Sequence, residues 1–162
     1  MAALSRPLRA ATAPASVLGD EIDLGRWLHP VPVAGVFEDS DWCIWCGSAV
    51  RGDDGNYRLF YSRWPSRLGR LARVTHSEVA RAACASPTGP YRHAGVVLPA
   101  CGEKSRDGSR TRNPNIFRVG KKLCIYRMRN VGDGIVPAKR LKRIHRNHQR
   151  IGVATADSPA GP

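Results

Sequence analysis

The sequence lacks any apolar run of the roughly 18 residues that a membrane-spanning helix needs, so no membrane span is predicted. Its start, MAALSRPLRAATAPASVLGDE, has no apolar core of about 7 to 15 residues, which argues against a secretory signal. An organelle-targeting segment stays open, because this stretch carries Arg6 and Arg9 and no acid before Asp20. An irregular lead-in over residues 1–30 is the simpler interpretation, and the localisation stays undetermined.

Acidic residues are scarce. The 162-residue chain has 13 Asp and Glu against 26 Lys and Arg, which gives a formal net charge of +13. Such a balance raises the hypothesis of a nucleic-acid partner. The densest basic run, KRLKRIHRNHQR at residues 139–150, could follow phosphates or form a solvated loop. Because no recognition motif for nucleic acid accompanies the charge, this class of partner is disfavoured.

Cysteines are few and scattered. The five do not suggest a disulfide framework, because their number is odd. Cys43 and Cys46 form a Cys-x-x-Cys pair without a second such pair, and they fall within a predicted strand. Side chains three residues apart on a strand point to opposite faces, which disfavours a shared metal ion. No metal or other cofactor is predicted.

Gly and Pro are plentiful, at 16 and 12 residues, as is typical of a turn-rich β protein. The central element is a β-hairpin over residues 41–64, DWCIWCGSAVRGDDGNYRLFYSRW. Its strands are rich in aromatic and branched residues, and its turn at residues 52–56 contains Asp-Gly, which suits tight hairpins.

Further strands are expected along the chain. Residues 74–84 could form a strand or a short helix, and a strand is predicted at 93–98. A polar loop is expected over 99–114. A second hairpin over 116–129 turns at Val119-Gly120-Lys121, and after a long loop at 130–147 a last strand covers 151–155.

A weak internal repeat organises these strands. Ser-Pro-Thr-Gly-Pro at residues 86–90 recurs as Ser-Pro-Ala-Gly-Pro at 158–162, an offset of 72. Gly55 before Leu-Phe-Tyr corresponds to Gly120 before Cys-Ile-Tyr, an offset of 65. A hairpin-based unit of this length predicts four-stranded propeller blades. Two blades are nearly present, whereas a closed propeller needs at least about four.

Several ordered strings carry a family resemblance. WCGSAVRGDDGNYRLFYSRWP, VTHSEVARAACASPTGPYRH, DGSRTRNPNIFRVGKKLCIYRM, NVGDGIV and HRNHQRIGVATADSPAGP resemble bacterial proteins of the glycoside hydrolase family 43 type. The resemblance covers about residues 30–162. It implies an all-β, five-bladed β-propeller of which residues 31–162 carry about the first two blades, at 36–98 and 107–162. Relatives of this type act on polysaccharide side chains and are often exported.

Departures from the family pattern introduce most of the unusual residues. Arg112-Asn113-Pro114 stands where His-Asn-Pro is expected, and Arg106-Asp107-Gly108 where Trp-Asp-Gly is expected. Cys124 stands where an expected aromatic run has Tyr, and Arg129 stands where Gly is expected at its end. Each change needs a single base, so the charge is interpreted as a by-product of gene decay or sequence error.

Glycoside hydrolysis needs two carboxyl groups that flank the bond. The resemblance implies an inverting pair, with the base in blade one, a tuning Asp in blade three and the acid Glu in blade four. Asp41 and Asp39 are the candidates for the base; a solvated loop acid is the alternative for both. Asp107 is a candidate polar contact or a turn residue. A chain without the later blades is expected to be inactive alone and to need them to close the propeller.

Sugar binding needs aromatic faces and directed hydrogen bonds. The candidates are Trp45, Ser48, Arg63, Trp64, Asn113, Asn130, Arg146, Asn147 and Gln149. For the polar members, a structural role in turns and loops is the alternative, and for Trp64 a place in the core. The predicted partner is a carbohydrate substrate. Three functions follow in order: a hydrolase-like propeller fragment, a carbohydrate-binding fragment without catalysis, and a basic nucleic-acid binder.

Overall fold

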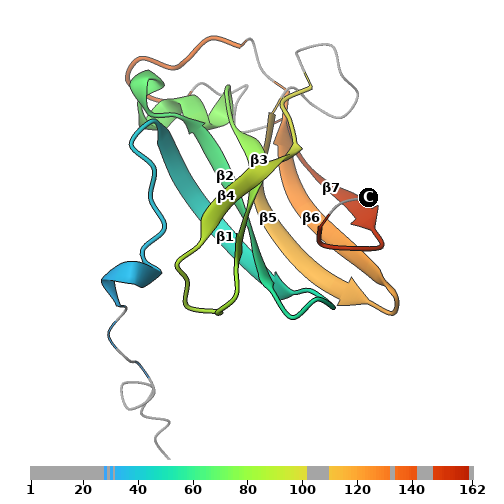
Figure 1. The fold of residues 1–162 in the computed structure, drawn as a ribbon. Coiled ribbons are helices and arrows are strands. Elements are labelled where there is room, and N and C mark those ends of the chain that lie inside the picture. Colours follow the sequence, from blue (N-terminus) through green and yellow to red (C-terminus); the bar gives the residue numbers. More distant parts are fainter. Residues whose placement is uncertain are drawn as a thin grey trace, which may run out of the picture. The chain divides into compact units, whose positions relative to one another are not determined.

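The computed structural model describes residues 28, 30, 32–101, 110–131, 134–141 and 148–160. Its regular elements lie in one compact unit, Pro32–Pro162, and consist of strands and short 3-10 turns (Figure 1). The strands form two antiparallel sheets, one of four strands and one of three. The all-β architecture expected from the sequence is confirmed. None of the helices described in this part of the chain is long and apolar enough to cross a membrane.

The first sheet has the order β1-β2-β3-β4, with β1 at Trp42–Arg51, β2 at Tyr57–Pro65, β3 at Glu78–Cys84 and β4 at Arg92–Leu98. The predicted first hairpin is confirmed. Gly55 has φ 79°, so it supplies the left-handed conformation that the turn between β1 and β2 needs. Consecutive strands pair throughout, as in a propeller blade.

Short 3-10 turns occupy the segments beside this sheet. They are η2 at Val33–Gly35, η3 at Ser66–Leu68 and η4 at Arg70–Val74. The ambiguous stretch 74–84 divides at this point, because η4 ends at Val74 and β3 begins at Glu78. The strand prevails over the local helix preference of its alanines, since β3 pairs with both β2 and β4.

The second sheet has the order β5-β6-β7, with β5 at Arg110–Val119, β6 at Lys122–Asn130 and β7 at Gln149–Ala156. The hairpin at Gly120 is confirmed, with φ 58° at that residue. The loop predicted over 99–114 is wrong in its last part, because β5 already begins at Arg110. A break in register between Arg112 and Asn115 lets the strand pass through Pro114 without a ladder hydrogen bond from it.

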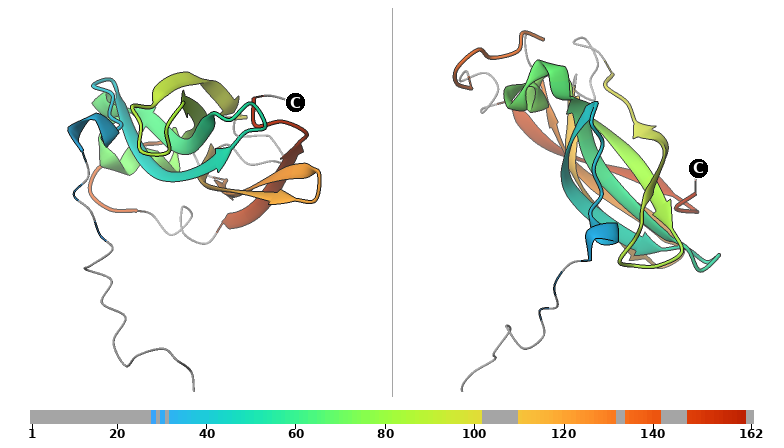
Figure 2. Two further views of the ribbon diagram at one scale, coloured as in Figure 1. Left: turned by 60° about the horizontal axis from the view of Figure 1, so that its bottom comes forward. Right: turned by 60° about the vertical axis from the view of Figure 1, so that its left-hand side comes forward.

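The main core lies between the two sheets. Phe60 and Val79 of the first sheet pack with Ile116, Leu123 and Ile125 of the second, and all five are buried. Figures 1 and 2 show the sheets side by side, with β5 next to β1 and β2. Hydrogen bonds fix this arrangement: the amide of Ile116 donates to Ser48 Oγ over 3.1 Å. Neighbouring blades of a propeller pack in this way.

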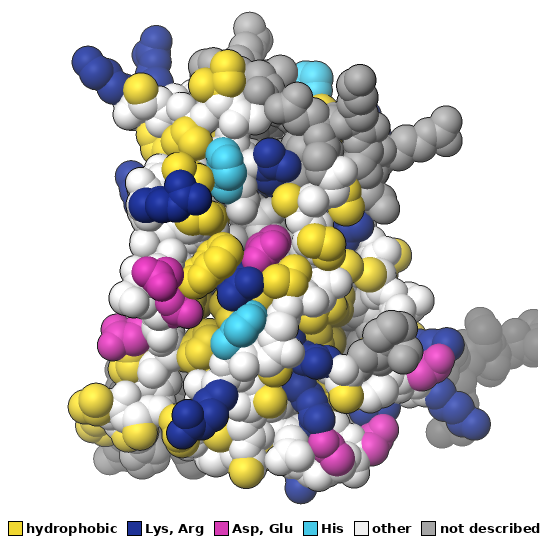
Figure 3. All heavy atoms as spheres, turned by 45° about the horizontal axis from the view of Figure 1, so that its top comes forward, with side chains coloured by type: hydrophobic (Ala, Val, Ile, Leu, Met, Phe, Trp, Pro, Cys, Tyr) yellow, Lys and Arg dark blue, Asp and Glu magenta, His cyan; other side chains and the backbone are white. Residues whose placement is uncertain are grey.

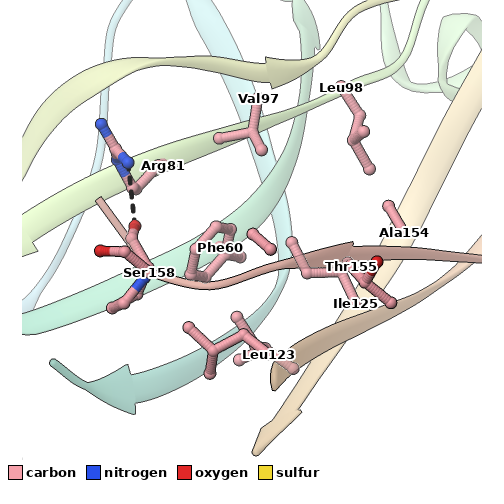
Figure 4. Close-up of a pocket in the computed structure, with 12 residues that line it drawn as sticks. Phe60, Arg81, Val97, Leu98, Leu123, Ile125, Ala154, Thr155 and Ser158 are labelled. Atoms are coloured by element: carbon pink, nitrogen blue, oxygen red, sulfur yellow. Dashed lines mark hydrogen bonds between the residues drawn. The ribbon is translucent and has the colours of Figure 1, made fainter. Parts of the chain in front are cut away.

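An apolar cavity of about 200 Å³ remains in this interface (Figure 4). Phe60, Val97 and Leu98 line it from the first sheet, and Leu123 and Ile125 line it from the second. At its rim the Arg81 guanidinium donates to the carbonyl of Pro159 over 2.9 Å. Most of the lining is apolar, with Arg81, Thr155 and Ser158 as the polar members, so we regard this cavity as a packing void between blades.

The outer faces of the two sheets differ. On the first sheet, Tyr61, Ala80 and Ala82 are buried under Phe37 and Tyr91. On the second sheet, four apolar side chains of the outer face stay about half or more exposed: Phe117, Tyr126, Ile151 and Val153. Strand β2 is therefore covered on both faces, whereas β5, β6 and β7 are covered on one.

Candidate functional site

Two β-bulges distort strands β1 and β5 where the sheets meet. The register between β1 and β2 breaks between Trp45 and Gly47, and Cys46 there has φ 48°. The register between β5 and β6 breaks between Arg112 and Asn115, and Asn113 has φ 52°. Positive φ values outside glycine are uncommon, and bulges often lie next to functional sites, where they redirect side chains. Asn113 is held by its amide, which donates to Ser62 Oγ over 2.8 Å.

A pocket of about 220 Å³ lies beside these bulges. Its aromatic part is formed by Trp45, which is 52% exposed, and by Trp64, which is 2% exposed. The indole N–H of Trp64 donates to the carbonyl of Gly69 over 3.1 Å, so this ring is fixed in place. An exposed indole face beside a rigid one suits stacking against an apolar ring surface. The remaining lining residues are Ser62, Arg73, Arg112, Asn113, Met128, Leu141 and Gln149.

Two guanidinium groups, those of Arg73 and Arg112, line the pocket, and no carboxylate of the described residues pairs with them. The pKa of Arg112 is lowered by burial and further by the positive charge of Arg73. Arg112 donates from Nη2 to Sδ of Met128 over 3.5 Å, a weak acceptor, and its buried Nε has no hydrogen-bond partner among the described residues. The pKa of Arg73 is also lowered, first by burial and then by Arg70. Within the described part of the chain, neither arginine forms an ion pair.

The pocket collects four residues that the sequence singled out: Trp45, Trp64, Asn113 and Gln149. They come from β1, β2, β5 and β7, and their side chains line a common space only because the two sheets pack together. Trp64 fits both interpretations, a place in the core and a place in the binding pocket, since it is buried and also lines the pocket. The sequence alone did not single out Arg73 or Arg112 as binding residues. The only signal was that Arg112 stands where His is expected before Asn113-Pro114.

Other candidates lie away from the pocket. Ser48 joins the sheets, because its hydroxyl donates to Asn115 Oδ1 over 3.2 Å and accepts from the amide of Ile116. Asn130 is buried at the end of β6, where it pairs with Arg110 and Gln149 of the flanking strands. Ser48 and Asn130 thus have the surroundings of residues with a structural role, which is the alternative to sugar binding.

Arg63 lies on the opposite face of β2 from Trp64. It donates from Nε to Glu78 Oε1 over 2.8 Å, and its guanidinium lies 3.9 Å from the centre of the Trp42 ring. Its Nη1 is 3.3 Å from Nε2 of His93, whose Nδ1 is 2.8 Å from the Tyr61 hydroxyl. Because an arginine can only donate, Nε2 accepts, and the neutral His93 then donates from Nδ1 to Tyr61. Arg63 is therefore the centre of a network that includes Glu78, Trp42, His93 and Tyr61.

Asp39 and Asp41 are exposed residues just before β1. Asp39 accepts from the amide of Asp41 over 2.9 Å through Oδ1 and forms an isolated bridge with Trp42. Neither carboxylate lines the pocket. The candidate bases and the candidate sugar-binding pocket are thus separate in the described structure. Asp107, Arg146 and Asn147 lie outside the described residues.

Charge is distributed over the surface without a single basic stripe on the face shown in Figure 3, where acidic side chains lie between the Lys and Arg side chains. Arg118 forms an ion pair with Asp53, with 3.1 Å between Nη2 and Oδ1. Among the described residues, no group of three or more His, Cys, Asp or Glu could hold a metal ion, and the five cysteines are free.

Solved glycoside hydrolases share this fold. The family 117 enzyme Zg3597 of Zobellia galactanivorans is 20% identical with a TM-score of 0.56, covering 78% of this chain and 40% of its own. CoXyl43, a family 43 β-xylosidase/α-arabinofuranosidase from a compost metagenome solved with xylotriose, is 21% identical with a TM-score of 0.51, covering 74% and 33%. A family 43 enzyme of Xanthomonas citri in complex with xylose is 21% identical with a TM-score of 0.50, covering 74% and 30%. No family sequence model matches the chain, and no curated protein sequence matches it significantly.

The fold is accordingly that of part of a β-propeller of the glycoside hydrolase family 43 type. Its two antiparallel sheets do not close into a ring. The chain spans 40% or less of the length of the hydrolases named above.

Proposed function

We propose that this chain is the sugar-binding part of a glycoside-hydrolase-like propeller protein, and that the pocket beside the two bulges holds one sugar unit of a polysaccharide. The observation that supports it is the meeting of Trp45, Trp64, Asn113 and Gln149 from four strands. An indole face stacks on the C–H surface of a pyranose, and amide groups both donate to and accept from hydroxyls.

Hydrolysis by the described part alone is not expected. Two carboxyl groups must flank the scissile bond, about 5 to 9.5 Å apart. No Asp or Glu is among the described residues that line the pocket. Asp39 and Asp41 remain the proposed base positions, and their partner acid would come from later blades. The proposal therefore combines binding by this chain with catalysis only in a completed propeller.

Binding can be measured by tryptophan fluorescence while xylotriose and arabinan or galactan oligosaccharides are added to the purified full chain. We expect a saturable change, and we expect Trp45→Ala to lower the affinity about fivefold or more, if a sugar ring on one indole gains a free energy similar to the about 1 to 3 kcal/mol of a stacked nucleobase. Phe117→Ala is the matched control, because Phe117 is similarly exposed (49%) but lies on the outer face of the second sheet. Equal effects of the two variants, or no binding, would contradict the assigned pocket.

The catalytic part has its own measurement. The chain alone should release no reducing sugar from arabinan, xylan or galactan. Release that Asp39→Asn or Asp41→Asn abolishes would show that the later blades are not needed.

A further inference from the structure

The two arginines that line the pocket indicate the charge of its ligand. This inference rests on the proposed sugar-binding function. Arg73 and Arg112 both line the same cavity, and the pKa of Arg112 is lowered by burial and by the charge of Arg73. Two like charges therefore face one small space. An anion between them would relieve both the repulsion and the loss of hydration.

Two arginines of the first sheet, Arg63 and Arg58, differ from the pocket pair because each has a carboxylate partner. Arg63 has a carboxylate at 2.8 Å, from Glu78, and an indole face at 3.9 Å. Arg58 is likewise paired, with Asp54. In the part of the chain that is described, Arg112 has only the Met128 sulfur and Arg73 only the Arg70 carbonyl, at 3.0 Å. An anionic ligand group would give both pocket arginines the kind of partner that Glu78 gives Arg63.

The neighbouring side chains show what would carry this anionic group. The exposed ring of Trp45 offers a stacking face, and Asn113 and Gln149 offer amide donors and acceptors to hydroxyl groups. A planar guanidinium fits a carboxylate or an ester sulfate through two parallel hydrogen bonds. We infer that the pocket binds an acidic sugar, in which a carboxylate or sulfate group lies between Arg73 and Arg112 while the pyranose ring stacks on Trp45.

Matched ligand pairs test this inference on the unmodified chain by calorimetry. One pair is xylotriose with and without a glucuronate substituent, and the other is galactobiose with and without a sulfate ester. A charge-assisted hydrogen bond contributes about 1.5 to 3 kcal/mol, so the charged member of at least one pair should bind about tenfold or more tightly than the neutral one. The pair that shows the preference separates carboxylate from sulfate as the source. Raising NaCl from about 50 mM to about 500 mM should reduce the preference.

Arginine variants locate the preference. Arg112→Gln and Arg73→Gln should bring the charged and neutral ligands to equal affinity and leave neutral binding in place. Arg92→Gln removes the same charge from an exposed position at the start of strand β4 and should leave the preference unchanged. Near-ultraviolet circular dichroism of each variant reports whether the pocket tryptophans keep their surroundings.

The outcomes separate the two proposals. Equal binding of charged and neutral members by the unmodified chain would overturn the acidic-sugar inference while sugar binding stands. Binding of no oligosaccharide would overturn both. Tight binding of an oligonucleotide with a steep salt dependence, in place of sugars, would overturn both proposals and support a nucleic-acid-binding function instead.

Discussion

Replacing Glu78 by Gln tests whether Arg63 has a structural role. The pair joins Arg63 Nε to Glu78 Oε1 over 2.8 Å, and the two side chains are only 10% and 18% exposed. Removing one member of a buried pair costs about 3 to 5 kcal/mol. Glutamine keeps one oxygen acceptor, and Arg63 keeps the Trp42 ring and His93. We therefore expect Glu78→Gln to lower the free energy of unfolding by about 2 kcal/mol.

Urea denaturation followed by tryptophan fluorescence measures this loss. With a slope of about 1 to 3 kcal/mol per molar, the midpoint should fall by about 1 M. Asp53→Asn is the control, because it breaks the Arg118 pair, which has a similar 3.1 Å contact but is 36% and 81% exposed. An exposed pair contributes about 0 to 1 kcal/mol, so this variant should shift the midpoint little.

A loss below about 0.5 kcal/mol for Glu78→Gln would refute the argument from burial. The double variant Arg63→Met with Glu78→Leu adds a second criterion, since apolar replacement of both members is often neutral. Oligosaccharide affinity should stay unchanged in Glu78→Gln, because Arg63 and the pocket lie on opposite faces of β2. A fall in affinity would instead indicate that Arg63 contributes to sugar binding.

Three further predictions concern the core, the bulge and the pH dependence. Leu123→Ala between the sheets should cost about 3 kcal/mol by urea denaturation, whereas Val119→Ala, exposed by 58%, should cost little; similar losses would contradict the assigned core. Asn113→Ala should lose about 1 kcal/mol more than Asn113→Gly because φ is 52°, while both should weaken sugar binding; equal stabilities would exclude strain at the bulge. Burial and the charge of Arg63 lower the pKa of His93, so the fold favours its neutral form. The free energy of unfolding should fall as the pH drops below the ordinary histidine pKa of about 6.5, and His93→Gln should reduce this slope; an unchanged slope would count against His93.

Local signals predicted most of the strands. The Asp-Gly turn and Gly120 identified the two hairpins, because a positive φ at a turn is a property of one or two residues. The start of β5 at Arg110 was missed, since Arg112-Asn113-Pro114 looks like a loop until a bulge and pairing with β6 accommodate it. The stretch 74–84 stayed ambiguous for a similar reason. It forms a strand because β3 pairs with β2 on one side and with β4 on the other, which the local sequence does not show.

The candidate site could be predicted only in part. Trp45, Trp64, Asn113 and Gln149 were chosen by chemical type, and they line one pocket. Arg112 was noticed only as a departure from a pattern, because nothing local shows that no described carboxylate pairs with its guanidinium.

The sequence by itself determined the all-β class, the positions of the turns and the repeat of hairpins, because alternation, glycine and proline act over a few residues. The tertiary structure decided which face each side chain occupies and which distant residues meet. Arg63 and Trp64 are neighbours in the chain, yet one belongs to a salt-bridged network and the other to the pocket. The physical reason is the twofold period of a strand: packing of the second sheet against one face of β2 assigns opposite surroundings to adjacent residues.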